Sequence, residues 1–224
     1  MTEQLEYRNY WHRKELLARG APPFPVKRWW ESESLSDAEK IILDAVKNAG
    51  KLLDVGAGDF RVKRKLELHG FDGLYHTQDI AEEFTYTYRS LAEVDESYDA
   101  ILCLDVIEHL SLQDGLALLS RLNDLLSPGG KLVIQTPNAR CIRSPLGWDM
   151  THLQCYNGQD LWAFLSQLDM DVDGYRIVFG RKPKNPFALF RFALGAFVAS
   201  RVLGCDYADN LLLIAQRPSA GLAA

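Results

Sequence analysis

Four acidic or histidine side chains are of the types that transfer protons or bind a metal ion. Asp105, Glu108 and His109 follow an apolar segment closely, and His152 comes later in the chain. Histidine titrates near neutral pH, and carboxylates with imidazoles bind divalent cations, here with magnesium as the candidate. We predict Glu108, His109 and His152 as catalytic residues and, if a metal is bound, all four as its ligands. The alternative is structural: an acid at a helix start, and histidines that fix their loops.

A second group of residues forms a glycine-rich turn, Gly56-Ala57-Gly58, directly after an apolar segment. Glycines lack Cβ, so a ligand can approach this backbone closely. A dinucleotide site would favour a third glycine where Arg61 stands, and Asp59 would place a carboxylate near any pyrophosphate. Asp54 and Asp59 therefore favour a cationic ligand over a phosphate. Asp79, 25 positions after Asp54, stands where nucleoside-binding α/β folds hold ribose hydroxyls.

The elements that position these groups alternate short apolar strands with amphipathic helices. This is the pattern of a Rossmann-like, doubly wound α/β fold, with a mainly parallel sheet and an antiparallel edge strand. We predict an N-terminal helical cap or lid over residues 1–38, with a second helix from Ser36, and one domain over 39–224. The predicted strands are 51–55, 73–80, 99–104, 131–136, 172–178 and 210–216, and the predicted helices are 60–69, 111–127 and 158–168.

In three segments the chain resembles class I S-adenosylmethionine-dependent methyltransferases: LLDVGAGDF at 52–60, YDAILCLDVIEHL at 98–110 and LSPGGKLVI at 126–134, with Asp79 between the first two. The resemblance covers about residues 50–180. It implies S-adenosylmethionine as cofactor, with Asp54, Gly56, Ala57 and Gly58 at the cofactor turn. Asp79 would contact the ribose, and Leu104 and Asp105 would contribute from the end of the fourth strand.

The chain departs from the family pattern between Asp79 and Asp99, where only 19 residues intervene. A crossover between parallel strands usually needs a dozen or more residues, so a helix here must be very short or absent. We predict Ser90 and Leu91 at the adenine edge.

The histidine and acid pattern resembles two methyltransferase branches, ubiquinone-pathway and related O-methyltransferases, and metal-dependent enzymes that methylate the terminal 2′-hydroxyl of small RNAs. The net charge of −5, from 25 Lys and Arg against 30 Asp and Glu, argues against nucleic acid. We therefore expect a small-molecule acceptor, methylated at a hydroxyl oxygen, in secondary-metabolite or cell-surface glycan biosynthesis. The alternatives are the RNA enzyme and a non-catalytic binding protein of the same fold.

The four cysteines have no close pairing, and the charged N-terminus has no apolar core typical of a secretory signal. Both features favour a cytoplasmic location. Phe187 to Cys205 is apolar but interrupted by Arg191 and Arg201, and it is short for a membrane span. We expect this segment to pack in the core or in a homodimer, with a wall for an apolar acceptor or a membrane contact as alternatives.

Overall fold

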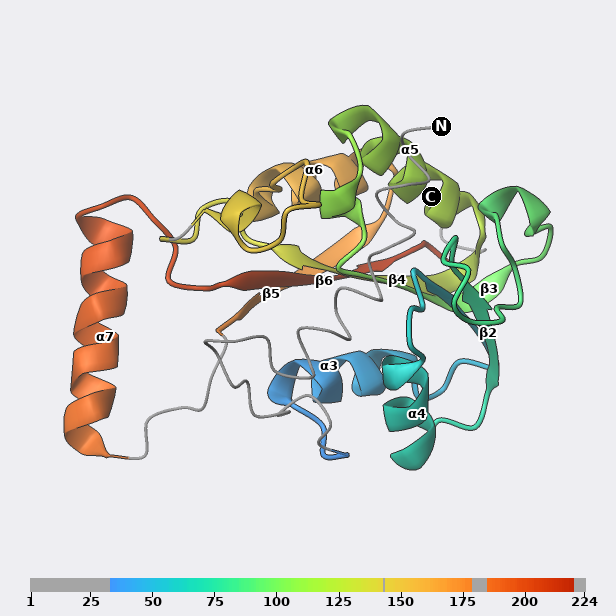
Figure 1. Ribbon diagram of the computed structural model, residues 1–224, viewed down its shortest axis with the longest axis horizontal. Coiled ribbons are helices and arrows are strands. Elements are labelled where there is room, and N and C mark those ends of the chain that lie inside the picture. The colour runs from blue at the N-terminus through green and yellow to red at the C-terminus, as the bar shows by residue number, and fades with distance from the viewer. Residues whose placement is uncertain (1–32, 143, 179–184, 220–224) are drawn as a thin grey trace.

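The computed structural model describes residues 33–142, 144–178 and 185–219. Its centre is a six-stranded sheet of order β2-β1-β3-β4-β6-β5 (Figure 1). Strands β2, β1, β3 and β4 are parallel, whereas β6 is antiparallel to both β4 and β5. The strand bounds are β1 Lys51–Val55, β2 Leu74–Gln78, β3 Tyr98–Leu104, β4 Leu126–Pro137, β5 Asp171–Ile177 and β6 Asn210–Gln216. The predicted Rossmann-like fold and its antiparallel edge pair are confirmed.

Helices cover both faces of this sheet, with α3 and α4 on one side and α5 and α6 on the other (Figure 1). Their bounds are α3 Asp37–Val46, α4 Arg61–Leu68, α5 Leu112–Asp124 and α6 Gly158–Gln167. Ser36, Ser111 and Asn157 cap α3, α5 and α6, since each side chain accepts a hydrogen bond from a first-turn backbone N–H. Such a cap stabilises a helix by about 1 kcal/mol. The helix from Ser36 is confirmed, while the rest of the predicted cap, residues 1–32, lies outside the described residues.

The core consists of two apolar layers separated by the sheet. Leu53 and Ile101 pack beneath α5 and α6, and Leu52 and Leu102 pack against α3 and α4. Successive side chains of a strand point to opposite faces, so a strand that is covered on both sides must be apolar at every position. Among the four buried positions of β1, only Asp54 breaks this rule, and it lies two residues before Gly56.

The crossover from β2 to β3 contains one short 3₁₀ turn, Leu91–Glu93, and no α-helix. The expectation of a very short or absent helix is confirmed. The segment instead runs beside β2, where Tyr88 forms an isolated parallel bridge with Gln78. Tyr88 N–H donates to the Thr77 carbonyl at 3.0 Å.

Helix α7, Pro186–Arg201, stands apart from the two helical layers at one end of the sheet (Figure 1). The expectation that this apolar segment packs in the core is wrong, because Ala199 is the one residue of α7 that is buried. Homodimer packing stays a prediction. Among the described residues, no helix combines the length and apolar character needed to cross a membrane.

Candidate active site

The glycine turn joins β1 to α4 and is held by the neighbouring strand. The N–H groups of Gly56 and Ala57 both donate to the Gln78 carbonyl, at 2.8 and 3.2 Å. Gly56 and Gly58 have φ of 73° and 53°, a region that side chains with a Cβ rarely adopt. A Cβ on Gly56 would also clash with the Val106 side chain. The turn therefore needs glycine for its backbone shape and for its contact with the loop after β3.

Asp79 lies at the end of β2 beside this turn. One carboxylate oxygen accepts from Gly58 N–H and the other from Ala81 N–H, both at 2.9 Å. A carboxylate has about four lone-pair positions, so each oxygen retains capacity to accept from a ligand hydroxyl. The predicted ribose contact is compatible with this position and stays a prediction.

Asp54 is 2% exposed, and its carboxylate accepts from the Tyr75 hydroxyl at 2.7 Å. Burial raises the pKa of Asp54 to about 7, against the opposing effect of this hydrogen bond and with a smaller contribution from Asp79. Asp54 thus lies beneath the turn, among the side chains that support it. Direct contact of its carboxylate with the cofactor stays a prediction.

Asp54→Asn should change how stability depends on pH. Because the folded-state pKa of Asp54 is raised, its contribution to stability is fully present below about pH 4 and is lost as pH rises through 7. The free energy of unfolding of the wild type should therefore fall relative to Asp54→Asn by roughly 2 to 4 kcal/mol between pH 4 and pH 8. Urea unfolding across this range measures the difference. Parallel curves for the two proteins would contradict the assignment, and Asp72→Asn, at an exposed site, is the control.

Three aromatic side chains cluster at the glycine turn. The rings of Phe60, Phe84 and Tyr86 have centroids 5.3 to 6.4 Å apart, and the Tyr86 hydroxyl donates to the Gly58 carbonyl at 3.0 Å. Ala57, 7% exposed, packs in the same cluster. Sequence reasoning missed Tyr86 as part of the cofactor turn. The Phe84-Thr85-Tyr86 sequence in so short a crossover was the one available signal.

The other predicted cofactor residues fall in two places. Ser90 caps the short turn Leu91–Glu93, and Leu91 packs against the core beneath α5. Leu104 ends β3, and Asp105 follows it with a φ of 54°. The Asp105 carboxylate accepts from the Gln135 side chain at 2.9 Å. Contact of these residues with adenine or with the rest of the cofactor stays a prediction.

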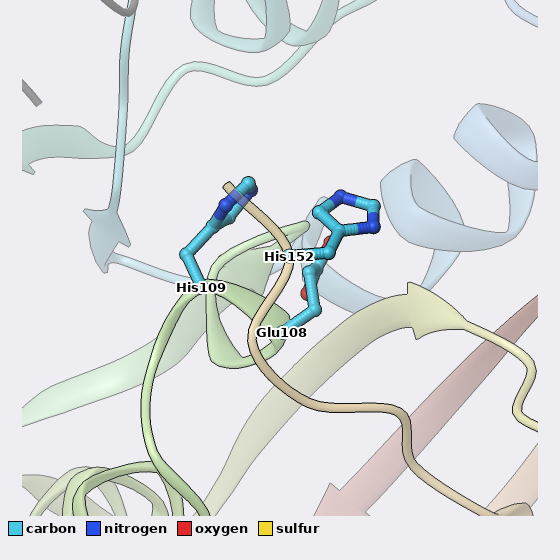
Figure 2. A group of neighbouring side chains, drawn as sticks. All are labelled: Glu108, His109 and His152. Atoms are coloured by element: carbon cyan, nitrogen blue, oxygen red, sulfur yellow. The ribbon is translucent and has the colours of Figure 1, made fainter. Parts of the chain in front are cut away.

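The side chains of Glu108, His109 and His152 come together beyond the end of β3, as Figure 2 shows. One ligand atom from each lies within 4.8 Å of the others, and the imidazole centroids are 4.9 Å apart. The backbone N–H of Leu153 donates to the Glu108 carbonyl at 2.8 Å, which ties the His152 loop to the loop after β3. Asp105 is not in this group. Besides the hydrogen bond from Gln135, its carboxylate accepts one from the Asn210 side chain at 3.4 Å. The structure thus assembles three of the four predicted metal ligands.

The hydrogen bonds of the two imidazoles fix which nitrogen carries the proton. Nδ1 of His152 lies 2.8 Å from the Pro145 carbonyl, which can only accept. Nδ1 of His109 lies 2.9 Å from Thr151 Oγ1, whose own proton goes to Asp149 at 2.9 Å. Both rings therefore carry hydrogen on Nδ1 when neutral, and the lone pair is on Nε2. Nε2 can act as a base or as a metal ligand.

Glu108 is 1% exposed and accepts from the Thr136 hydroxyl at 3.0 Å. Thr136 lies in β4, so this contact fixes the short 3₁₀ turn Ile107–His109 against the sheet. Val106, one residue earlier, contacts the glycine turn at Gly56. The cofactor turn and the histidine group are thus neighbours at the carboxyl edge of the strands, where open α/β sheets bind their ligands.

The sheet with its covering helices and the glycine turn together are those of the S-adenosylmethionine-dependent methyltransferase fold. A family model described as a methyltransferase domain matches residues 29–172, more than half of the chain. The chain belongs to this methyltransferase family. No curated protein matches the sequence.

Solved structures with the same fold include an S-adenosylmethionine-dependent methyltransferase from Archaeoglobus fulgidus, with 16% identity and a TM-score of 0.63 over 93% of this chain and 100% of that one. Magnesium protoporphyrin IX methyltransferase from Synechocystis PCC 6803, with bound S-adenosylmethionine, has 16% identity and a TM-score of 0.52 over 80% of this chain and 76% of that one. The cyclase SpnF has 15% identity and a TM-score of 0.63 over 97% and 96%. At such identities the likeness concerns the fold alone.

Proposed function

We propose that the protein transfers the methyl group of S-adenosylmethionine to a hydroxyl oxygen of a small-molecule acceptor, with His152 as the base that takes the hydroxyl proton. The observation that carries the proposal is the pair of imidazoles with Nε2 lone pairs, one of them in the loop after β3, whose Val106 contacts the glycine turn. A hydroxyl is a weak nucleophile, and a base of near-neutral pKa is the group that activates it.

The residues at the turn fit S-adenosylmethionine. Gly56 presents exposed backbone without a side chain, and Asp79 can accept hydrogen bonds from ribose hydroxyls. Asp59 and Asp105 place further acidic groups near the turn, which favours a ligand with a sulfonium and an ammonium group. When bound, S-adenosylmethionine supplies a methyl group on a positively charged sulfur, which becomes a neutral thioether once the methyl has moved.

The side chains of this protein then have three tasks. The turn and Asp79 would hold the cofactor in line with the acceptor, because alignment of the two reactants is what a displacement chiefly requires. His152 Nε2 would take the proton that the acceptor hydroxyl loses. Its Nδ1 bond to Pro145 keeps the ring in the tautomer with the lone pair on Nε2.

The loop that carries His152 favours a small, partly apolar acceptor. Its side chains include several large exposed apolar groups: Ile142, Leu146, Met150 and Leu153, at 49 to 83% exposure. An RNA substrate would instead call for a basic groove. The net charge of −5 supports the same choice.

Calorimetry with S-adenosylmethionine is the first test of this proposal. We expect binding in the micromolar range, followed by release of S-adenosylhomocysteine with at least one acceptor from a panel of phenols, catechols and sugars. Binding without turnover across the panel would favour the non-catalytic alternative. The absence of any heat of binding at high micromolar cofactor would contradict methyl transfer to a small molecule and methyl transfer to RNA alike.

A second candidate is a metal-dependent methyl transfer, supported by the proximity of Glu108, His109 and His152. Two imidazoles and one carboxylate suit manganese or zinc better than magnesium, which prefers oxygen ligands. In this case Glu108, His109 and His152 would hold the ion, and the acceptor hydroxyl would lose its proton next to it. Turnover that is lost in EDTA and restored by manganese would replace the first candidate by this one.

A further inference from the structure

The outward face of α7 is made of large apolar side chains. Phe187, Phe190, Leu194 and Phe197 recur at the spacing of a single helix face and are 50 to 67% exposed. Soluble proteins usually place such a stripe against the core. Here the stripe is exposed, on a helix that stands at one end of the molecule (Figure 1).

The opposite face of α7 carries Phe192 and small residues, and it is attached to the body. The Phe192 ring packs edge-on against the Tyr207 ring at 4.8 Å, Gly195 lies over the same ring, and Ala199 is buried. An apolar groove of about 410 Å³ runs between the helix and the residues Ile142 and Tyr207. These contacts fix the position of the helix, and they leave the apolar stripe exposed.

The charge around α7 differs from that of the rest of the protein. Residues 179–205 contain five Lys or Arg and no Asp or Glu, which leaves the rest of the chain with 20 basic against 30 acidic residues. Arg191 and Arg201 lie on the helix near the apolar stripe and are exposed, and Arg191 also lines the groove. Exposed arginines beside exposed aromatic groups are complementary to a surface that is apolar beneath and negatively charged on top.

We propose that the outer face of α7 docks on the surface of an anionic lipid bilayer. Phe187, Phe190 and Phe197 would enter the boundary between headgroups and acyl chains, and Arg191 and Arg201 would contact lipid phosphates. With 16 residues, α7 is about 24 Å long, shorter than the hydrocarbon core, so it lies on the membrane. A second copy fits less well, because the stripe would bring Arg191 and Arg201 of both chains together without an acidic partner on the helix.

Docking of α7 would also place the acceptor side near the lipid. The backbone N–H of Asp206, just after α7, donates to the Arg140 carbonyl, and the Arg140 side chain donates to the Gly204 carbonyl at 3.0 Å. Arg140 lies in the loop that leads to His152. The exposed apolar residues of that loop, Met150 and Leu153 among them, would then face molecules that enter from the bilayer.

Vesicle co-sedimentation of the full chain tests the proposal. We expect binding to phosphatidylcholine vesicles with about 30% phosphatidylglycerol, at least about ten-fold stronger than to phosphatidylcholine alone. Phe190→Ser with Phe197→Ser should reduce binding at least about ten-fold. Arg191→Glu with Arg201→Glu should abolish the preference for anionic lipid, as should salt well above physiological concentration. Trp162→Ser, at an exposed site on α6, should leave binding unchanged.

Thermal unfolding and cofactor affinity check separately that the variants are folded. Both should match those of the wild type. Two results would overturn the docking proposal. One is an absence of vesicle binding at every lipid composition. The other is a dimer in light scattering that the two phenylalanine substitutions dissociate, which would assign the stripe to a second copy of the chain.

Discussion

Gly56→Val should abolish binding of S-adenosylmethionine, with a loss of affinity of at least about a hundred-fold. Residue 56 has a φ of 73°, which is strained for any residue with a Cβ and worst for a β-branched one. Its Cβ would also collide with the Val106 side chain, so either the turn or the loop after β3 would have to move. The new side chain would in addition occupy the surface where a ligand approaches. Calorimetry with S-adenosylmethionine measures the loss.

Gly70→Val is the matched control for backbone strain. Gly70 has a φ of 100°, but a Cβ there would meet no atom within 4 Å. This variant should lose stability and retain its affinity for the cofactor. Combining Gly56→Ala with Val106→Ala removes much of the clash and should recover part of the binding lost in Gly56→Ala. Near-normal affinity in Gly56→Val would show that the cofactor site lies elsewhere.

The sheet and the covering helices could be predicted from sequence because local signals and burial agree there. Lys51–Val55 and Asn210–Gln216 are strands at the predicted bounds, and Asn157 caps α6 as expected. Strand β4 begins five residues earlier than the predicted 131, at Leu126, and α5 ends at Asp124. Ser127-Pro128-Gly129-Gly130 has the composition of a turn, but its backbone continues the strand. Element ends are where such local signals are weakest.

The site was less accessible to sequence reasoning because its contacts join distant positions. Spacing placed Asp105 with Glu108 and His109, yet the Asp105 carboxylate binds Gln135 and Asn210, which are 30 and 105 positions away. The acidic residue in the glycine motif suggested ligand contact, which stays a prediction, and sequence reasoning missed its hydrogen bond with Tyr75, 21 positions away. For α7, composition alone predicted burial, whereas Phe192 and the small residues of one face attach the helix and leave the other large side chains exposed.

His152→Ala should remove methyl transfer and leave cofactor binding intact. As a general base, His152 should contribute about 10² to 10⁴-fold to kcat. Affinity for S-adenosylmethionine should stay within about two-fold, because the role that we propose for His152 concerns the acceptor and not the cofactor. A purely structural histidine would alter stability or KM and leave kcat close to that of the wild type.

His69→Ala provides a matched control for His152→Ala. Its Nδ1 also lies 2.8 Å from a backbone carbonyl, that of Lys65, but it is at the end of α4 on an exposed surface. Loss of that hydrogen bond should change stability slightly and turnover not at all. His152→Gln separates the remaining roles, because its side-chain amide can donate to Pro145 but cannot take a proton near neutral pH. Turnover by His152→Gln at the wild-type rate would reduce His152 to a residue that fixes its loop, and His109 would become the candidate base.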